Sequence, residues 1–121
     1  MQKDPQTERI IGCCFKVHSE LGPGFPEKIY HNALEKALAK TGISFVSEKN
    51  FRVAFQGESV GSFKVDLLVE ERVIVEVKAV SGVIPKIFAA QVLAYLKAAR
   101  LPVGLLVNFG NTNCQISRFV L

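Results

Sequence analysis

The chain has no tryptophan, one methionine and only three cysteines among its 121 residues. Cys13, Cys14 and Cys114 form no Cys-x-x-Cys pair and are odd in number, so we expect neither a disulfide framework nor a zinc site. The apolar runs are too short to span a bilayer, and the polar first eight residues do not read as a signal peptide. These absences favour a soluble cytoplasmic protein with free thiols and no membrane partner.

Length and composition are those of an ordinary folded domain. Hydrophobic residues make up 49% of the chain and charged residues 21%, which is a globular and not a disordered composition. A chain of 121 residues can form one proper core, so we expect a single domain over residues 1–121. The formal net charge of +4 is compatible with a polyanionic partner but is too small to identify one.

Apolar residues recur at intervals of three and four in three segments, which predicts amphipathic helices over about residues 5–21, 26–42 and 85–100. Runs rich in Val, Ile, Leu and Phe predict strands over about residues 51–55, 62–70, 72–79, 103–109 and 114–121. The order is therefore α-α-β-β-β-α-β-β. Because a strand, helix, strand unit makes a parallel crossover, we expect an α/β (α+β) fold whose central mixed sheet is flanked by helices.

Two of these strands carry the polar residues on which the functional interpretation depends. The charged junction at 70–72 predicts a hairpin, and an antiparallel register centred on Glu71 sets Asp66 opposite Glu76. Two carboxylates at the cross-strand distance of about 5 Å repel each other unless something compensates them. Carboxylate oxygens are ligands that Mg²⁺ or Mn²⁺ prefers, and Lys78 would point at whatever such an ion binds.

Strand alternation also predicts which residues share a face with these acids. Glu76 and Lys78 share a face of their strand with Ile74. Asp66 shares a face of the preceding strand with Lys64 and Leu68. The opposite face of the first strand would then hold Phe63, Val65, Leu67 and Val69. The alternative to a metal site is structural, with Asp66 and Lys78 as a diagonal cross-strand ion pair on a solvated face.

Three further polar residues lie on faces expected to point inward. Glu27 lies three residues before Tyr30 in the first turn of the second helix, where a carboxylate gains from the helix dipole or binds a metal ion. Gln91 and Tyr95 are one turn apart on a largely apolar face of the third helix. Buried Gln and Tyr side chains often only satisfy backbone groups, so both interpretations stay open for them.

Taken together, these motifs resemble a known family. Residues 24–30 read Gly-Phe-Pro-Glu-Lys-Ile-Tyr, Asp66 is followed by Glu-Val-Lys at 76–78, and Gln91 precedes Tyr95 by four positions. In this order they resemble the PD-(D/E)XK nuclease superfamily and, over nearly the whole chain, its GxxExxY family. The resemblance implies a restriction-endonuclease-like core.

The resemblance also implies a role for each site residue. Glu27, Asp66 and Glu76 with the carbonyl of Val77 would hold Mg²⁺ or Mn²⁺. Lys78 would orient or activate the attacking water and stabilise charge on the phosphate. Gln91 would assist this chemistry, and the side chains that position the site or the nucleic acid would be Tyr30, Gln91 and Tyr95.

The resulting hypothesis is a metal-dependent nuclease that hydrolyses phosphodiester bonds of DNA or RNA. Four cations are candidate phosphate contacts, although the simpler interpretation is that they form only the solvated face: Lys64, Lys86, Lys97 and Arg100. The alternative function is a module that keeps the nuclease fold and binds nucleic acid or protein without turnover. A homodimer or a partner protein is compatible with either function.

Overall fold

A computed structural model describes residues 4–121, and its helices and strands follow the predicted order. The helices are α1 (Pro5–Leu21), α2 (Glu27–Lys40) and α3 (Ile87–Ala99). The strands are β1 (Phe45–Phe55), β2 (Glu58–Val69), β3 (Val73–Lys78), β4 (Val103–Asn108) and β5 (Gln115–Val120). No helix within residues 4–121 has the length and apolar character needed to cross a membrane.

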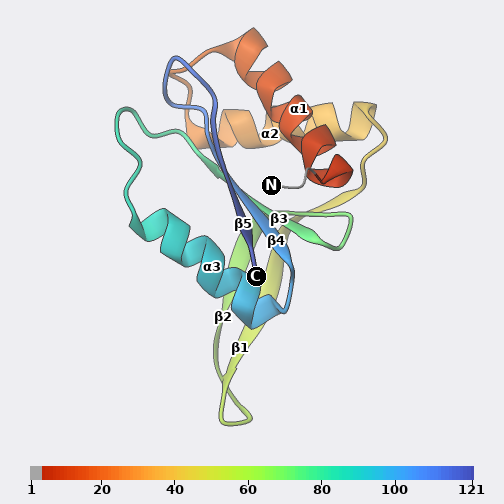
Figure 1. Cartoon of the computed structure of the whole chain (residues 1–121), viewed down its shortest axis with the longest axis vertical. Helices are drawn as coiled ribbons and strands as arrows, with labels where there is room; N and C mark the ends of the chain where they lie inside the picture. Colours follow the sequence, from red (N-terminus) through yellow and green to blue (C-terminus); the bar gives the residue numbers. More distant parts are fainter. Residues whose placement is uncertain (1–3) are drawn as a thin grey trace.

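All five strands form one mixed sheet in the order β1-β2-β3-β4-β5 (Figure 1). The pairs β1–β2, β2–β3 and β4–β5 are antiparallel, whereas β3 and β4 are parallel and joined through α3. The predicted parallel crossover is therefore confirmed. Helices α1 and α2 cover one face of the sheet and α3 covers the other, as the fold class required (Figure 1).

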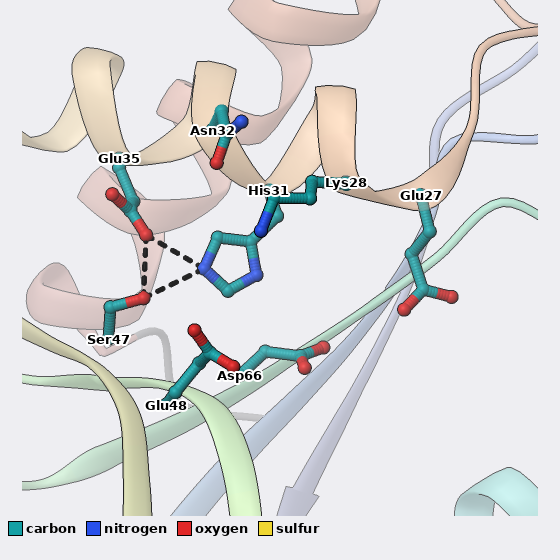
Figure 2. A pocket seen from close by; sticks show the side chains of 8 residues that line it. All are labelled: Glu27, Lys28, His31, Asn32, Glu35, Ser47, Glu48 and Asp66. Atoms are coloured by element: carbon teal, nitrogen blue, oxygen red, sulfur yellow. Dashed lines mark hydrogen bonds and ion pairs between the residues drawn. The ribbon is translucent and has the colours of Figure 1, made fainter.

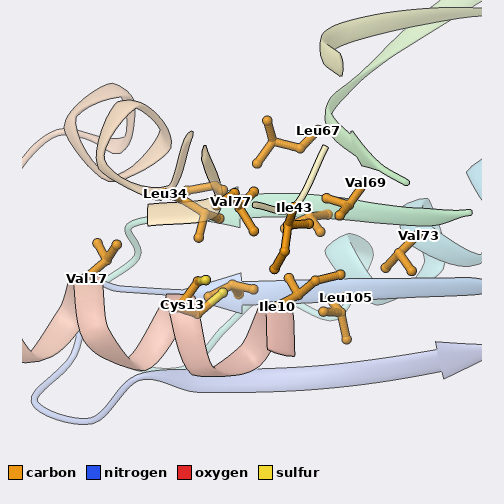
Figure 3. Packing of buried hydrophobic residues seen from close by; sticks show 14 of the residues in the cluster. Ile10, Cys13, Val17, Leu34, Ile43, Leu67, Val69, Val73, Val77 and Leu105 are labelled. Atoms are coloured by element: carbon orange, nitrogen blue, oxygen red, sulfur yellow. The ribbon is translucent and has the colours of Figure 1, made fainter. Parts of the chain in front are cut away.

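Each face of the sheet has its own hydrophobic core. The larger core lies under α1 and α2, where Ile10, Cys13 and Val17 of α1 pack with the strands (Figure 3). The smaller core lies under α3 and is formed by Val92 and Leu96 with apolar residues of the strands. Strand β4 is buried along its whole length because it lies between the two cores, which is why its sequence is an almost unbroken apolar run.

One prediction about β2 is wrong. Val65 was expected to share a face with Leu67, but Val65 packs under α3 with Leu68, and Leu67 packs in the larger core. The alternation therefore breaks at Asp66. At the facing position of β1, Glu48 has a left-handed φ of 53° between two regular pairs, Ser47 with Leu67 and Lys49 with Val65.

The first hairpin is longer than the sequence predicted. Strand β1 begins at Phe45 and β2 at Glu58, so only Gln56 and Gly57, both with positive φ, form the turn. This two-residue turn has the signature of a tight hairpin connection whose twist matches that of its strands. The hairpin tip projects away from the rest of the molecule beside α3 (Figure 1).

The segment that follows β3 is clamped to the end of β4. The amide of the buried Asn108 accepts a hydrogen bond from Val80 N–H at 2.8 Å and donates one to the Val80 carbonyl at 2.9 Å. Gly110 passes so close to this segment that a Cβ atom there would lie 2.4 Å from the Val80 carbonyl oxygen. These contacts fix the chain two residues after Lys78.

Candidate active site

The predicted register of Asp66 and Glu76 is confirmed. The β2–β3 ladder pairs Leu67 with Val75 and Leu68 with Ile74, which extends to Asp66 opposite Glu76. Regular pairing stops one step earlier, at Leu67. The two acids therefore lie where these two strands cease to pair through their backbones.

Beyond that point the carboxylates replace backbone carbonyls as hydrogen-bond acceptors. The Asp66 N–H donates to Oε2 of Glu76 at 2.7 Å, and the Val77 N–H donates to Oδ2 of Asp66 at 2.7 Å. Each carboxylate is thus held by the opposite strand through one oxygen. A pair fixed in this way is preorganised, because both side chains have already lost their rotamer freedom.

Glu76 occupies an unfavourable environment for a negative charge. It is only 4% exposed, and burial together with the charge of Asp66 raises the pKa of its carboxyl to about 7. No lysine or arginine forms a salt bridge with either acid within residues 4–121. Two oxygen ligands with uncompensated charge are a donor set that fits a divalent cation.

Lys78 lies beside the two acids without pairing with them. Its Nζ is 4.3 Å from the centroid of the Phe88 ring, at the start of α3. The structural alternative, a direct ion pair between Asp66 and Lys78, is therefore not formed. A cation placed over an aromatic face keeps its charge and its hydrogen-bond donors available.

Glu27 begins α2 and faces the same region from the other side. Burial raises the pKa of its carboxyl, the nearby Lys78 opposes that increase, and the charge of Asp66 adds to it. However, no group of three His, Cys, Asp or Glu side chains in the described part of the chain is close enough to hold a metal ion. The structure thus pairs Asp66 with Glu76 and leaves Glu27 outside that pair.

Tyr30 fixes the loop that leads to Glu27. Its side chain is fully buried and stacks on Phe109 with the ring centroids 4.8 Å apart. Its hydroxyl accepts a hydrogen bond from Phe25 N–H at 3.1 Å and donates one to the Gly22 carbonyl. Tyr30 therefore sets where α2 starts and lies in the interior.

We expect Tyr30→Phe to lower the free energy of unfolding by about 1–2 kcal/mol, because two buried backbone groups lose a partner. Urea denaturation followed by circular dichroism measures the change, and an unaltered m value would show that the denatured state is the same. A loss below about 0.3 kcal/mol would contradict this role for the hydroxyl.

Helix α3 brings Tyr95 and Gln91 to the side of the sheet that carries Lys78. Tyr95 stacks on Phe63 with the ring centroids 4.2 Å apart. Burial raises the pKa of its hydroxyl, and the charges of Glu76 and Asp66 add to the increase. Tyr95 is therefore within electrostatic reach of both acids, and Gln91 lies one helical turn nearer the start of α3.

Sequence reasoning missed a cluster beside Asp66. Ser47 Oγ–H donates to Oε2 of Glu35 at 2.7 Å, and Nε2 of His31 lies 2.8 Å from the same Oε2 and 3.0 Å from Ser47 Oγ (Figure 2). Both oxygens act as acceptors toward the ring, so Nε2 carries a proton. Figure 2 shows the second ring nitrogen on the side away from Glu35 and Ser47.

This cluster forms one wall of a pocket of about 210 Å³ that also touches Glu27 and Asp66 (Figure 2). The spacing of four residues between His31 and Glu35 was visible in the sequence as a helical pair. Ser47 belongs to β1, so its place in the cluster depends on how α2 packs on the sheet.

The four cations proposed as phosphate contacts are all exposed. Lys97 and Arg100 line one groove at the end of α3. Lys64 lies on β2, and Lys86 caps the start of α3. The structure therefore brings two of the four together and leaves the other two apart.

Comparison with known proteins gives one match, and it covers most of the chain. The family model of the PD-(D/E)XK nuclease superfamily matches residues 4–119. No curated protein and no solved structure matches the chain. The mixed five-stranded sheet flanked by helices is the restriction-endonuclease-like arrangement expected of that superfamily. With almost its whole length covered by this match, the chain belongs to the PD-(D/E)XK nuclease superfamily.

Proposed function

We propose that this protein is a divalent-metal-dependent nuclease of the GxxExxY type that hydrolyses phosphodiester bonds of DNA or RNA. The observation that carries this proposal is the pair of carboxylates, Asp66 and Glu76, fixed where β2 and β3 separate. Nothing in the folding of a hairpin requires two acids to face each other there, since like charges directly opposite are destabilising.

Mg²⁺ or Mn²⁺ would be held by Asp66, Glu76 and the Val77 carbonyl, with Glu27 as a further acid on the facing helix. When bound, the ion would lower the pKa of a water molecule and offset the charge that develops on the phosphate. The free oxygens of Asp66 and Glu76 are the donors that remain after each carboxylate has accepted one backbone hydrogen bond.

The remaining site residues bind and orient the substrate. Lys78 presents an unpaired ammonium group beside the acids, where it would orient the attacking water and stabilise charge on the phosphate. Gln91 and Tyr95 of α3 would position the nucleic acid backbone next to it. Tyr30 acts indirectly, because its hydroxyl fixes the loop before Glu27.

The substrate backbone would also meet cations outside the centre. Lys97 and Arg100 are the stronger candidates of the four, because they line a common groove. Lys64 and Lys86 are exposed single charges on separate elements and would contribute less.

A second function is favoured by one observation, the absence of a three-acid group within residues 4–121. With only Asp66 and Glu76 paired, the fold would serve as a nucleic-acid or protein binding module that performs no turnover. This alternative predicts metal-independent binding.

Incubation with labelled single- and double-stranded DNA and RNA tests the two functions. We expect cleavage of at least one substrate with Mg²⁺ or Mn²⁺ and none with EDTA. Metal-independent binding without cleavage would support the binding module instead. If neither cleavage nor metal-dependent binding occurs on any substrate, the nuclease proposal is wrong.

A further inference from the structure

A groove of about 460 Å³ runs between the β1–β2 hairpin and the last turns of α3. Three of the seven residues that line it are cationic: Arg52 of β1, Lys97 of α3 and Arg100, which ends that helix. The other four are Val53 and three alanines, and no acid lines the groove. The floor is thus formed by small apolar side chains and the rim by cations.

The three cations are available to a ligand. No salt bridge in the described part of the chain includes Arg52, Lys97 or Arg100, and all three are exposed. The pocket beside Asp66 has the opposite character, because four of its eight lining residues are acids. The cationic groove beside α3 therefore differs from the acidic pocket beside α2, and the groove is the one that would attract a polyanion.

A row of stacked rings lies under α3, on the same side of the sheet as the groove. Phe51 of β1 stacks on Phe63 of β2 at 5.6 Å between centroids, and Phe63 stacks on Tyr95 at 4.2 Å. Tyr95 in turn is within electrostatic reach of Glu76. Phe51 directly precedes Arg52 in β1, so the row ends next to the strand residues that line the groove.

The geometry of α3 gives the distance between the candidate active site and the groove. Phe88, which contacts Lys78, and Lys97 are both on α3. Nine residues at about 1.5 Å per residue separate them by about 13–14 Å along the helix axis. A nucleic acid strand that rises by about 3.4 Å per nucleotide covers this distance in about four nucleotides.

We propose that this groove holds the phosphate backbone of the nucleic acid about four nucleotides from the scissile bond, with Arg52 as a phosphate contact that the sequence did not indicate. The small side chains on the floor allow the backbone to approach the three cations closely. The position relative to the scissile bond rests on the proposed nuclease function, whereas the binding itself does not.

The test measures binding on the Lys78→Ala background, so that cleavage does not interfere. Fluorescence anisotropy with single-stranded and duplex oligonucleotides compares two triple variants of equal charge change. One carries Arg52→Gln, Lys97→Gln and Arg100→Gln, and the control carries three exposed substitutions on α1 and α2: Lys16→Gln, Lys36→Gln and Lys40→Gln.

We expect the groove variant to bind about 10- to 100-fold more weakly at 0.1 M salt and to reduce the salt slope by about two to three, as loss of three phosphate contacts requires. The control variant should change affinity less than about twofold. Affinity of the parent should rise when oligonucleotides are lengthened from about four to eight nucleotides, and the groove variant should lose this gain.

Equal losses in both triple variants, or no loss in the groove variant, would overturn the proposal. A groove variant that loses binding only to an acidic protein surface, with nucleic acid binding unchanged, would overturn it as well. Because none of these measurements depends on cleavage, the groove can be confirmed even if the nuclease proposal fails, and the reverse also holds.

Discussion

Lys78→Ala should lower kcat for phosphodiester cleavage by about 10²–10³-fold, with KM changed only a few-fold. The loss is expected in kcat because the ammonium group is placed to act on charge that develops in the transition state. Some stability should be lost as well, because the Lys78 ammonium contacts the Phe88 ring at 4.3 Å and is attracted to Glu27 and Glu76. Such a cation–π contact contributes about 0.5–1 kcal/mol.

Lys49→Ala is a matched control, because Lys49 is an exposed lysine on β1, which is separated from β3 by β2 in the same sheet. It should cleave at the wild-type rate. A loss of activity could come from weaker metal binding or from a slower chemical step, and calorimetry with Mn²⁺ distinguishes the two. Lys78→Ala should still bind the ion, because Asp66 and Glu76 are intact. Cleavage by Lys78→Ala within threefold of the wild type would show that Lys78 is not part of the reaction.

Lys78→Arg should restore only part of the rate, because a planar guanidinium does not reproduce a compact ammonium charge.

Much of the fold could be predicted because local and long-range signals agree. Apolar periodicity gave the three helices, and the short junction between β2 and β3 gave the register of Asp66 and Glu76. Register is strongly specified there, since a slip of one residue would move the valines of β3 out of the larger core and turn Glu76 toward it.

The face of β2 could not be predicted in the same way. Strict alternation assigns Val65 and Leu67 to one face, but they pack in different cores, and Glu48 at the facing position of β1 has a left-handed φ. Glutamate carries no local preference for that conformation. The irregularity is imposed by packing on two cores, which no single strand reveals.

The composition of the site was predictable only where residues share an element or a hairpin. Asp66 and Glu76 are such a pair, and they do meet. Glu27 approaches from α2, so its distance to the pair depends on how the helix packs, and the expected group of three acids is not formed within residues 4–121. The contact between His31 and Ser47 escaped prediction for the same reason.

Glu76→Gln should make the metal-free protein more stable than the wild type above pH 7, by up to about 3 kcal/mol. Burial and the charge of Asp66 raise the pKa of Glu76 from 4.5 to about 7. Between these values the native state holds a proton that the unfolded chain has released, so wild-type stability falls as pH rises from about 4.5 to 7. Glutamine cannot ionise, yet its side-chain oxygen still accepts the hydrogen bond from Asp66 N–H.

Thermal or urea unfolding in EDTA at several pH values between 4.5 and 8 measures this effect. The difference between wild type and variant is the useful quantity, because titrating groups that do not interact with Glu76 contribute equally to both. It should be near zero at pH 4.5 and largest at pH 8, whereas the exposed acid Glu58, changed to Gln, should give no such trend. A difference that does not vary with pH would mean that Glu76 has the same pKa in the folded and the unfolded protein. Added Mn²⁺ at pH 8 should then stabilise the wild type more than Glu76→Gln, because the same buried charge that destabilises the metal-free protein is the one that would bind the ion.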